Sequence, residues 1–179
     1  MVVIVMGVSG SGKTRIGTLL ASRTGVVFAD ADDYHSPANK VKMATGTPLT
    51  DEDRQPWLEH LNGILRGWVQ EGKGGVMACS ALKESYRETL EAGIPCTLIS
   101  FVMLDVSAEI IATRIAGRHH EFMSPKLLGS QFATLEPPSR EEAVHVCNDR
   151  SPDVVVEEIL QHAIPRDETS NTAAVPAAT

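Results

Sequence analysis

The chain reads Gly7-Val8-Ser9-Gly10-Ser11-Gly12-Lys13-Thr14 directly after the apolar run Val2–Met6. This phosphate loop fits G-x-x-x-x-G-K-[ST] at every fixed position. Its glycines let backbone N–H groups approach phosphate oxygens, and a helix that opens at its end favours negative charge there. Lys13 is expected to reach the β- and γ-phosphates of a nucleotide, and the Thr14 hydroxyl is expected to hold Mg²⁺.

The phosphate loop alone does not separate kinases from GTPases. A GTPase also needs a guanine-specifying Asn-Lys-x-Asp and an Asp-x-x-Gly switch. The stretch Asn39-Lys40-Val41-Lys42 carries a lysine where that aspartate belongs, and no Asp-x-x-Gly occurs in the chain. These differences argue against a GTPase switch.

Strand-like and helix-like segments alternate along the chain. The predicted strands are Val2–Met6, Val26–Ala29, Gly75–Cys79, Thr97–Leu104 and Ala143–Cys147, and the predicted helices are Arg15–Ser22, Arg54–Val69, Lys83–Ala92, Ser107–Ile115 and Ser151–Ala163. Asp53 is expected to cap the helix from Arg54, with Pro56 in its tolerant first turn. This alternation predicts an α/β fold with a parallel sheet and helices on both faces.

The length of 179 residues suits one domain, which we place at residues 1–164. The tail 165–179 is rich in Ala, Thr and Pro, lacks periodicity and is predicted to be disordered. No apolar run approaches the ~18 residues of a membrane span, and the N-terminus lacks the basic residues of a signal peptide. No membrane association is therefore expected.

The net charge is −7, which gives no support for a nucleic-acid-binding face. The chain has three cysteines, an odd count, and no Cys-x-x-Cys spacing. This usage favours a reducing compartment, so a cytoplasmic location is expected.

An acidic cluster, Asp30-Ala31-Asp32-Asp33-Tyr34-His35, follows the second predicted strand. Ligands of open α/β sheets bind beyond the carboxyl ends of the strands. Carboxylates there can help to hold Mg²⁺ or accept a proton from an attacking hydroxyl. Asp30 and Asp32 are expected on one side if the strand continues. The alternative is a solvated loop whose aspartates cap a turn.

Most of the lysines and arginines downstream are expected to be solvated surface residues. Arg114 and Arg118 differ, because they lie four positions apart on one face of a predicted helix and a polar stretch follows them. Phosphoryl transfer commonly uses a closing lid that brings arginines to the γ-phosphate. The two arginines are therefore predicted to bind the nucleotide from a mobile lid.

Several blocks together resemble the gluconate kinases, relatives of shikimate kinase among the P-loop kinases. The blocks are Gly7–Thr14, Asp30–Pro37, Asn39–Met43, Gly46–Leu58, Ala78–Lys83 with Tyr86-Arg87, Leu127–Phe132 and Thr134–Pro138. The resemblance implies a five-stranded parallel sheet, a mobile lid and a homodimer. It also implies that ATP phosphorylates the small molecule D-gluconate at its 6-hydroxyl to give 6-phospho-D-gluconate.

The resemblance assigns roles to residues that match the family's blocks. Asp32 resembles the residue that faces the acceptor hydroxyl and Mg²⁺, and Arg118 resembles the lid arginine. The positions implied on the substrate side are His35, Lys42, Arg54, Lys83, Arg87 and Gln131. Glu121 departs from the pattern, because the family usually has histidine there.

Two other functions remain open from the sequence. A shikimate or nucleotide kinase could use the same scaffold, although the Asn39–Met43 and Gly46–Leu58 blocks argue against it. A non-catalytic ATP-binding module is the alternative from a different class, and the altered lid is its only support.

Overall fold

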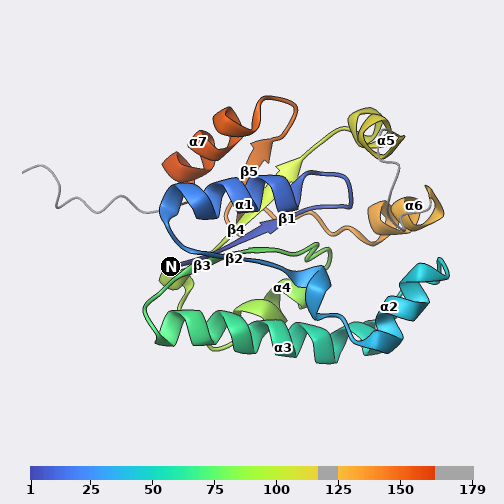
Figure 1. Cartoon of the computed structure of the whole chain (residues 1–179), viewed down its shortest axis with the longest axis horizontal. Helices are drawn as coiled ribbons and strands as arrows, with labels where there is room; N and C mark the ends of the chain where they lie inside the picture. The colour runs from blue at the N-terminus through green and yellow to red at the C-terminus, as the bar shows by residue number, and fades with distance from the viewer. Residues whose placement is uncertain (117–124, 164–179) are drawn as a thin grey trace, which may run out of the picture.

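A computed structural model describes residues 1–116 and 125–163 (Figure 1). Most of the predicted lid, including Arg118 and Glu121, and the predicted disordered tail 165–179 lie outside the described residues. Within the described part of the chain, no helix is long and apolar enough to cross a membrane.

Five parallel strands form one sheet, as predicted. In sheet order they are β2 (Val27–Asp30), β3 (Gly75–Ala78), β1 (Val2–Met6), β4 (Ile99–Asp105) and β5 (Ala143–Cys147). β1 lies at the centre and every one of its residues is buried. A strand covered on both faces needs an uninterrupted apolar run, which explains the composition of this segment.

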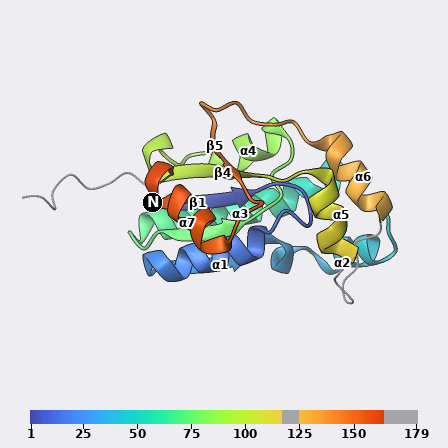
Figure 2. The same cartoon turned by 90° about the horizontal axis from the view of Figure 1, so that it is seen from above.

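Helices cover both faces of the sheet (Figures 1 and 2). α1 (Lys13–Thr24) and α7 (Pro152–His162) lie on one face, and α3 (Asp51–Gln70) and α4 (Glu84–Glu91) lie on the other. Side chains of β1 alternate between the two cores: Val3 and Val5 pack with α1 and α7, whereas Ile4 and Met6 pack with α3 and α4. Because successive strand side chains point to opposite faces, one strand anchors both layers.

The start of α3 differs from the prediction. Thr50, not Asp53, is the N-cap, and Asp53 is the third helical residue. Asp53 N donates to Thr50 Oγ1 over 3.2 Å, and Thr50 N donates to an Asp53 carboxylate oxygen over 3.0 Å. This capping box satisfies two backbone donors, so the helix starts three residues earlier than predicted and Pro56 lies inside it.

Other boundaries also differ. The second strand extends through Asp30, and a 3₁₀ turn, Ala31–Tyr34, follows, so Asp32 does not continue the strand. A second 3₁₀ turn, Cys96–Leu98, delays β4 by two residues relative to the prediction.

Two helices were not predicted, α2 (Pro37–Ala44) and α6 (Pro125–Thr134). Ser36 caps α2 by accepting from Asn39 N over 3.1 Å, and Pro37 occupies its first turn. This is the same Ser-Pro signal that correctly placed the start of α7.

Candidate active site

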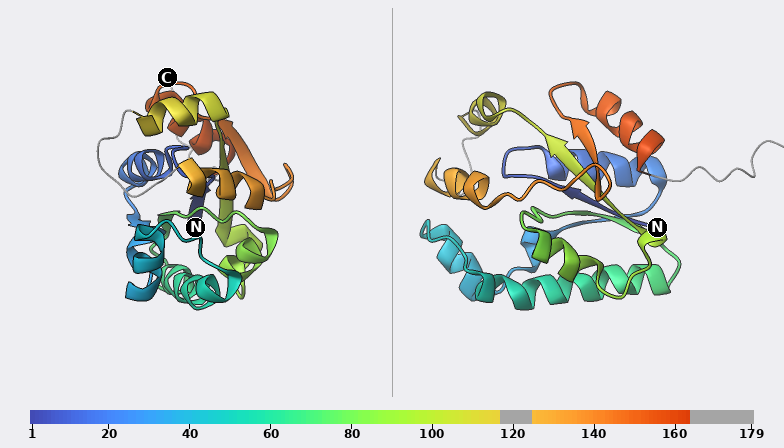
Figure 3. Two further views of the ribbon diagram at one scale, coloured as in Figure 1. Left: turned by 90° about the vertical axis from the view of Figure 1, so that its right-hand side faces the viewer. Right: turned by 180° about the vertical axis from the view of Figure 1, so that it is seen from behind.

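The phosphate loop and the acidic cluster meet at the carboxyl end of the sheet. Three helices, α2, α5 (Ala108–Ala116) and α6, gather at this end (Figures 2 and 3). The crevice beyond the carboxyl ends of parallel strands is where open α/β sheets bind ligands. The fold therefore places the phosphate loop and the acidic cluster where a ligand is expected.

Gly12 shows why the phosphate loop requires glycine. Its φ is +100°, and a Cβ there would lie 2.6 Å from Asn148 Nδ2. Gly12 is also the N-cap of α1 and contributes no side-chain cap to the first turn. The N-terminus of α1 therefore suits an anion supplied by a ligand.

Contacts from distant segments fix the shape of the loop. Ser11 O accepts hydrogen bonds from Asn148 Nδ2 over 2.6 Å and from Arg114 Nη1 over 3.2 Å. Lys13 folds back across the loop, and its Nζ donates to Val8 O over 3.1 Å. The lysine that is expected to serve the terminal phosphates therefore lies against the loop backbone.

A hollow of about 200 Å³ adjoins the loop, and α5 and the segment after β5 contribute to it. Its lining includes Gly12, Arg15, Arg114, Asn148, Arg150 and Pro152. Arg114, which was predicted on the nucleotide side, also donates to Asn148 O over 2.6 Å. Asn148 and Arg150 were missed from the sequence, because single residues far from any motif carry no signal.

Thr14 and Asp30 form a hydrogen-bonded pair of oxygen-bearing side chains beside the loop. Thr14 Oγ1 donates to Asp30 Oδ2 over 2.7 Å, and Asp30 Oδ1 accepts from Asp32 N over 3.2 Å. Hydroxyl and carboxylate oxygens suit Mg²⁺, which usually takes one or two carboxylates and completes its shell with phosphates and water. Among residues 1–116 and 125–163, no group of three or more His, Cys, Asp or Glu residues gathers as a metal site. The Thr14–Asp30 pair therefore suits a Mg²⁺ ion that a nucleotide also coordinates. Asp30 is added to the candidate Mg²⁺ ligands.

His35 is a buried histidine beside Asp32. Its side chain is 4% exposed, its Nε2 lies 3.9 Å from Asp32 Oδ1, and its Nδ1 has no hydrogen-bond partner among the described residues. The ring stacks on Trp57 with 4.1 Å between centroids, and Trp57 Nε1 donates to Ala31 O over 2.9 Å. Burial lowers the pKa of His35 to about 4, and the positive charges of Arg54 and Lys40 add to this effect. The ring is therefore neutral at pH 7.

The first turn of α3 pairs with the predicted substrate-side lysines. Lys42 Nζ donates to both carboxylate oxygens of Asp53 over 2.6 and 2.8 Å. Lys83 Nζ donates to both carboxylate oxygens of Asp51 over 2.9 and 2.7 Å. The hydrogen bond from Lys83 is the main cause that lowers the pKa of Asp51, and the same contact raises the pKa of Lys83.

An aromatic ring joins this group. Tyr86 donates its hydroxyl to Asp51. Its ring centroid lies 5.7 Å from the Arg54 guanidinium carbon and 5.5 Å from Lys83 Nζ, within the range of cation–π contacts. Arg54 also donates to Leu49 O. The structure therefore brings Arg54 and Lys83 together and places alternating cations and carboxylates around the start of α3.

Arg87 and Gln131 have other surroundings. Arg87 is buried, donates to Glu136 O over 3.0 Å and lies 3.5 Å from the Glu142 carboxylate, so it connects α4 to the segment after α6. Gln131 accepts a hydrogen bond from Ser9 N over 2.6 Å. Gln131 therefore contacts the phosphate loop, and the predicted substrate-side role of both residues stays a prediction.

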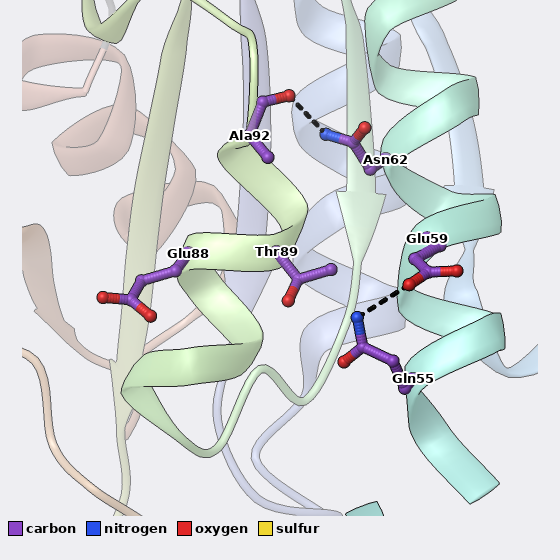
Figure 4. A pocket seen from close by; sticks show the side chains of 6 residues that line it. All are labelled: Gln55, Glu59, Asn62, Glu88, Thr89 and Ala92. Carbon is purple, nitrogen blue, oxygen red and sulfur yellow. Dashed lines mark hydrogen bonds between the residues drawn. The ribbon is translucent and has the colours of Figure 1, made fainter. Parts of the chain in front are cut away.

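A larger groove of about 410 Å³ lies between α3 and α4 (Figure 4). It is lined by Gln55, Glu59, Asn62, Glu88, Thr89 and Ala92. Asn62 Nδ2 donates to Leu90 O and to Ala92 O, both over 2.9 Å, and Gln55 donates to Glu59 over 2.9 Å. These polar groups connect or support the two helices, and none of the sequence-predicted site residues lines the groove.

Comparisons with known proteins show the family of the chain. The family model for shikimate kinase matches residues 9–164. A gluconokinase of Gluconobacter oxydans (strain 621H) is 49% identical over 161 residues, which cover 89% of each chain. The thermosensitive gluconokinase of Escherichia coli (strain K12) is 45% identical over 139 residues, 78% of this chain and 73% of the relative. The crystal structure of a gluconokinase from Sinorhizobium meliloti 1021 has a TM-score of 0.80 at 39% identity and 89% coverage of both chains. The chain belongs to the gluconokinase family, within the shikimate kinase group of P-loop kinases.

Proposed function

We propose that the protein transfers the γ-phosphoryl group of ATP to the 6-hydroxyl of D-gluconate and forms 6-phospho-D-gluconate. The observation that carries this proposal is the Thr14–Asp30 contact, which joins the phosphate loop to the acidic cluster. A phosphate-binding loop beside carboxylates is the arrangement that a phosphotransferase requires. The identity of 38 to 49% to gluconokinases over most of the chain supports gluconate as the acceptor.

Residues of the phosphate loop bind the triphosphate of ATP. Backbone N–H groups of the loop surround the phosphates, and Lys13 neutralises charge that develops on the transferring group. The hollow lined by Arg114, Asn148 and Arg150 is the place for the nucleoside, because it adjoins the loop and opens beside it. Arg118, which lies outside the described residues, is proposed to close over the phosphoryl group.

Mg²⁺ is proposed to bind at Thr14 and Asp32, with Asp30 beside them. When bound, Mg²⁺ would supply positive charge that offsets the negative charge of the triphosphate. The chain contributes by orienting these residues: Asp30 accepts from the Thr14 hydroxyl and from the Asp32 backbone N–H, so hydrogen bonds connect all three.

Asp32 is proposed to orient the 6-hydroxyl of gluconate and to accept its proton late in the transfer. The transition state of phosphoryl transfer is loose, so the carboxylate mainly positions the hydroxyl in line with phosphorus. Neutral His35 supports Asp32 from the buried side, and Lys42, Arg54, Lys83 and Arg87 complete the acceptor side. The pairing of Lys42 and Lys83 with aspartates supports a polyhydroxy acid, because alternating donors and acceptors match many hydroxyls and one carboxylate.

An assay coupled to 6-phosphogluconate dehydrogenase tests the proposal. With ATP, Mg²⁺ and gluconate, NADPH should form at a rate proportional to the protein. Shikimate and nucleoside monophosphates, read through ADP release, should give no signal above background. Absence of 6-phosphogluconate would reject gluconate as the acceptor, and ATP binding without any transfer would support the non-catalytic alternative.

The family resemblance also supports a homodimer, and the cysteine usage supports a cytoplasmic location. Both stay predictions. Sedimentation of the purified protein and fractionation of the source cells test them directly.

A further inference from the structure

Gln131 of α6 reaches a backbone N–H of the phosphate loop. Its Oε1 accepts from Ser9 N over 2.6 Å, between residues 122 positions apart in the chain. Because a backbone N–H can only donate, the end of the side chain that meets Ser9 is its carbonyl oxygen. A neutral oxygen therefore occupies a donor of the kind that binds phosphate oxygens in such a loop.

The Ser9 N–H lies on the terminal-phosphate side of the loop. Lys13 Nζ donates to Val8 O over 3.1 Å, so the ammonium group lies against the peptide that joins Val8 to Ser9. In loops of this pattern the lysine serves the β- and γ-phosphates, whereas the N–H groups at the helix start serve the α- and β-phosphates. The donor that Gln131 occupies is therefore next to the place of the γ-phosphate, which ATP has and ADP lacks.

We propose that Gln131 competes with the γ-phosphate for the Ser9 N–H and so sets the preference of the phosphate loop between ATP and ADP. This inference rests on the proposed function, because it requires the loop to bind ATP. A γ-phosphate oxygen is charged and is the stronger acceptor, so it displaces the amide oxygen when ATP binds. After transfer the γ-phosphate is gone, Gln131 returns to Ser9, and ADP has no atom with which to compete.

Hydrogen bonds fasten the chain at the C-terminal end of α6. Just beyond the helix, Glu136 N donates to Leu82 O over 2.8 Å, and the Glu136 carboxylate accepts from Glu84 N over 2.8 Å. These contacts connect the segment after α6 to Leu82 and to the first residue of α4. A rotation of the Gln131 side chain can therefore free Ser9 N without moving this end of α6, and Gln131 is a positioning residue for the loop.

Calorimetric titration with ADP and with the non-hydrolysable analogue AMP-PNP, both with Mg²⁺, tests the proposal. The measured quantity is the ratio of the Kd for ADP to the Kd for AMP-PNP. Gln131→Ala removes the competing oxygen and is expected to raise this ratio about three- to tenfold. Gln131→Glu keeps the shape but places a negative charge beside the γ-phosphate, and is expected to lower the ratio by about tenfold or more.

Gln161→Glu on α7 is the matched control, because it adds the same charge at an exposed position and should leave the ratio unchanged. Thermal unfolding checks that each variant is folded. A ratio within about twofold of the unmodified protein in both Gln131 variants overturns the proposal. A lower ratio in Gln131→Ala also overturns it, since the side chain then binds the γ-phosphate instead of competing with it. If the unmodified protein binds neither nucleotide, the proposed function fails too. If the unmodified protein phosphorylates gluconate normally but the Gln131 variants leave the Kd ratio unchanged, only the proposed role of Gln131 is rejected.

Discussion

Mild acid should destabilise the protein through His35. Burial against Trp57, together with Arg54 and Lys40, lowers the pKa of this ring to about 4, whereas an unfolded histidine titrates near 6.5. Between these two pKa values, His35 is therefore protonated in the unfolded chain and neutral in the native protein. The resulting stability is fully present above about pH 6.5 and is lost as the pH falls towards 4.

The size of the effect follows from the two pKa values. Between pH 7.5 and 4.5, the difference between these pKa values lowers the free energy of unfolding by at most about 2.5 kcal/mol. Asp32 lies 3.9 Å from the ring and is mostly exposed, so solvent and this carboxylate reduce the cost of protonation, and we expect about 1.5 kcal/mol. Urea unfolding followed by the fluorescence of Trp57 and Trp68 measures the free energy of unfolding at each pH.

A variant isolates the contribution of His35 from that of the carboxylates. His35→Phe keeps an aromatic ring against Trp57 but cannot titrate. Its loss of stability between pH 7.5 and 4.5 should be smaller than that of the unmodified protein by about 1.5 kcal/mol. His162→Gln removes an exposed histidine and should leave the pH dependence unchanged. Parallel pH profiles for His35→Phe and the unmodified protein would refute the reasoning.

Four further substitutions test individual contacts. Lys13→Ala should lower kcat by about a hundredfold or more in the coupled assay, because it removes a donor to the transition state; near-normal turnover would exclude that role. Asp32→Asn should lower kcat far more than the affinity for ATP, as titration calorimetry can show, and an unchanged kcat would contradict its assignment. Gly12→Ala should weaken nucleotide binding at least about tenfold, since its Cβ would lie 2.6 Å from Asn148 Nδ2, and normal affinity would show that the loop relaxes. Arg87→Met should destabilise the protein by about 2–3 kcal/mol in urea, since it removes a buried donor to Glu136 O; a raised KM for gluconate without loss of stability would instead support substrate contact.

Motifs and apolar runs were sufficient to predict the sheet. All five strands were predicted from predominantly apolar runs, and β1 and β5 match their predicted bounds residue for residue. Buried parallel strands need such runs, so the pattern is informative wherever a strand is covered on both faces. The main boundary error was the choice of Asp53 as the N-cap of α3. Thr50 and Asp53 both suit an N-cap, and only the reciprocal capping box distinguishes them.

The candidate site was only partly predictable. The phosphate loop is contiguous in sequence, so its residue types report its geometry directly. The contacts of Ser11 with Asn148 and of Ser9 with Gln131 join segments more than a hundred residues apart, and no local pattern encodes them. Asp30 was noticed in the acidic cluster, but its hydrogen bond with Thr14 depends on the strand ending at that residue.

The central position of β1 has a consequence for synthesis on the ribosome. Val2 pairs with Gly75 on one side and with Ile99 on the other, so β1, which is made before both of its neighbours, can pair only after they have been made. At about 5–20 residues per second, this wait is on the order of ten seconds. Asn148, which secures Ser11, is translated later still. A nascent chain that ends before Ala143 should therefore lack nucleotide affinity, and ATP cannot assist folding before Asn148 has been made.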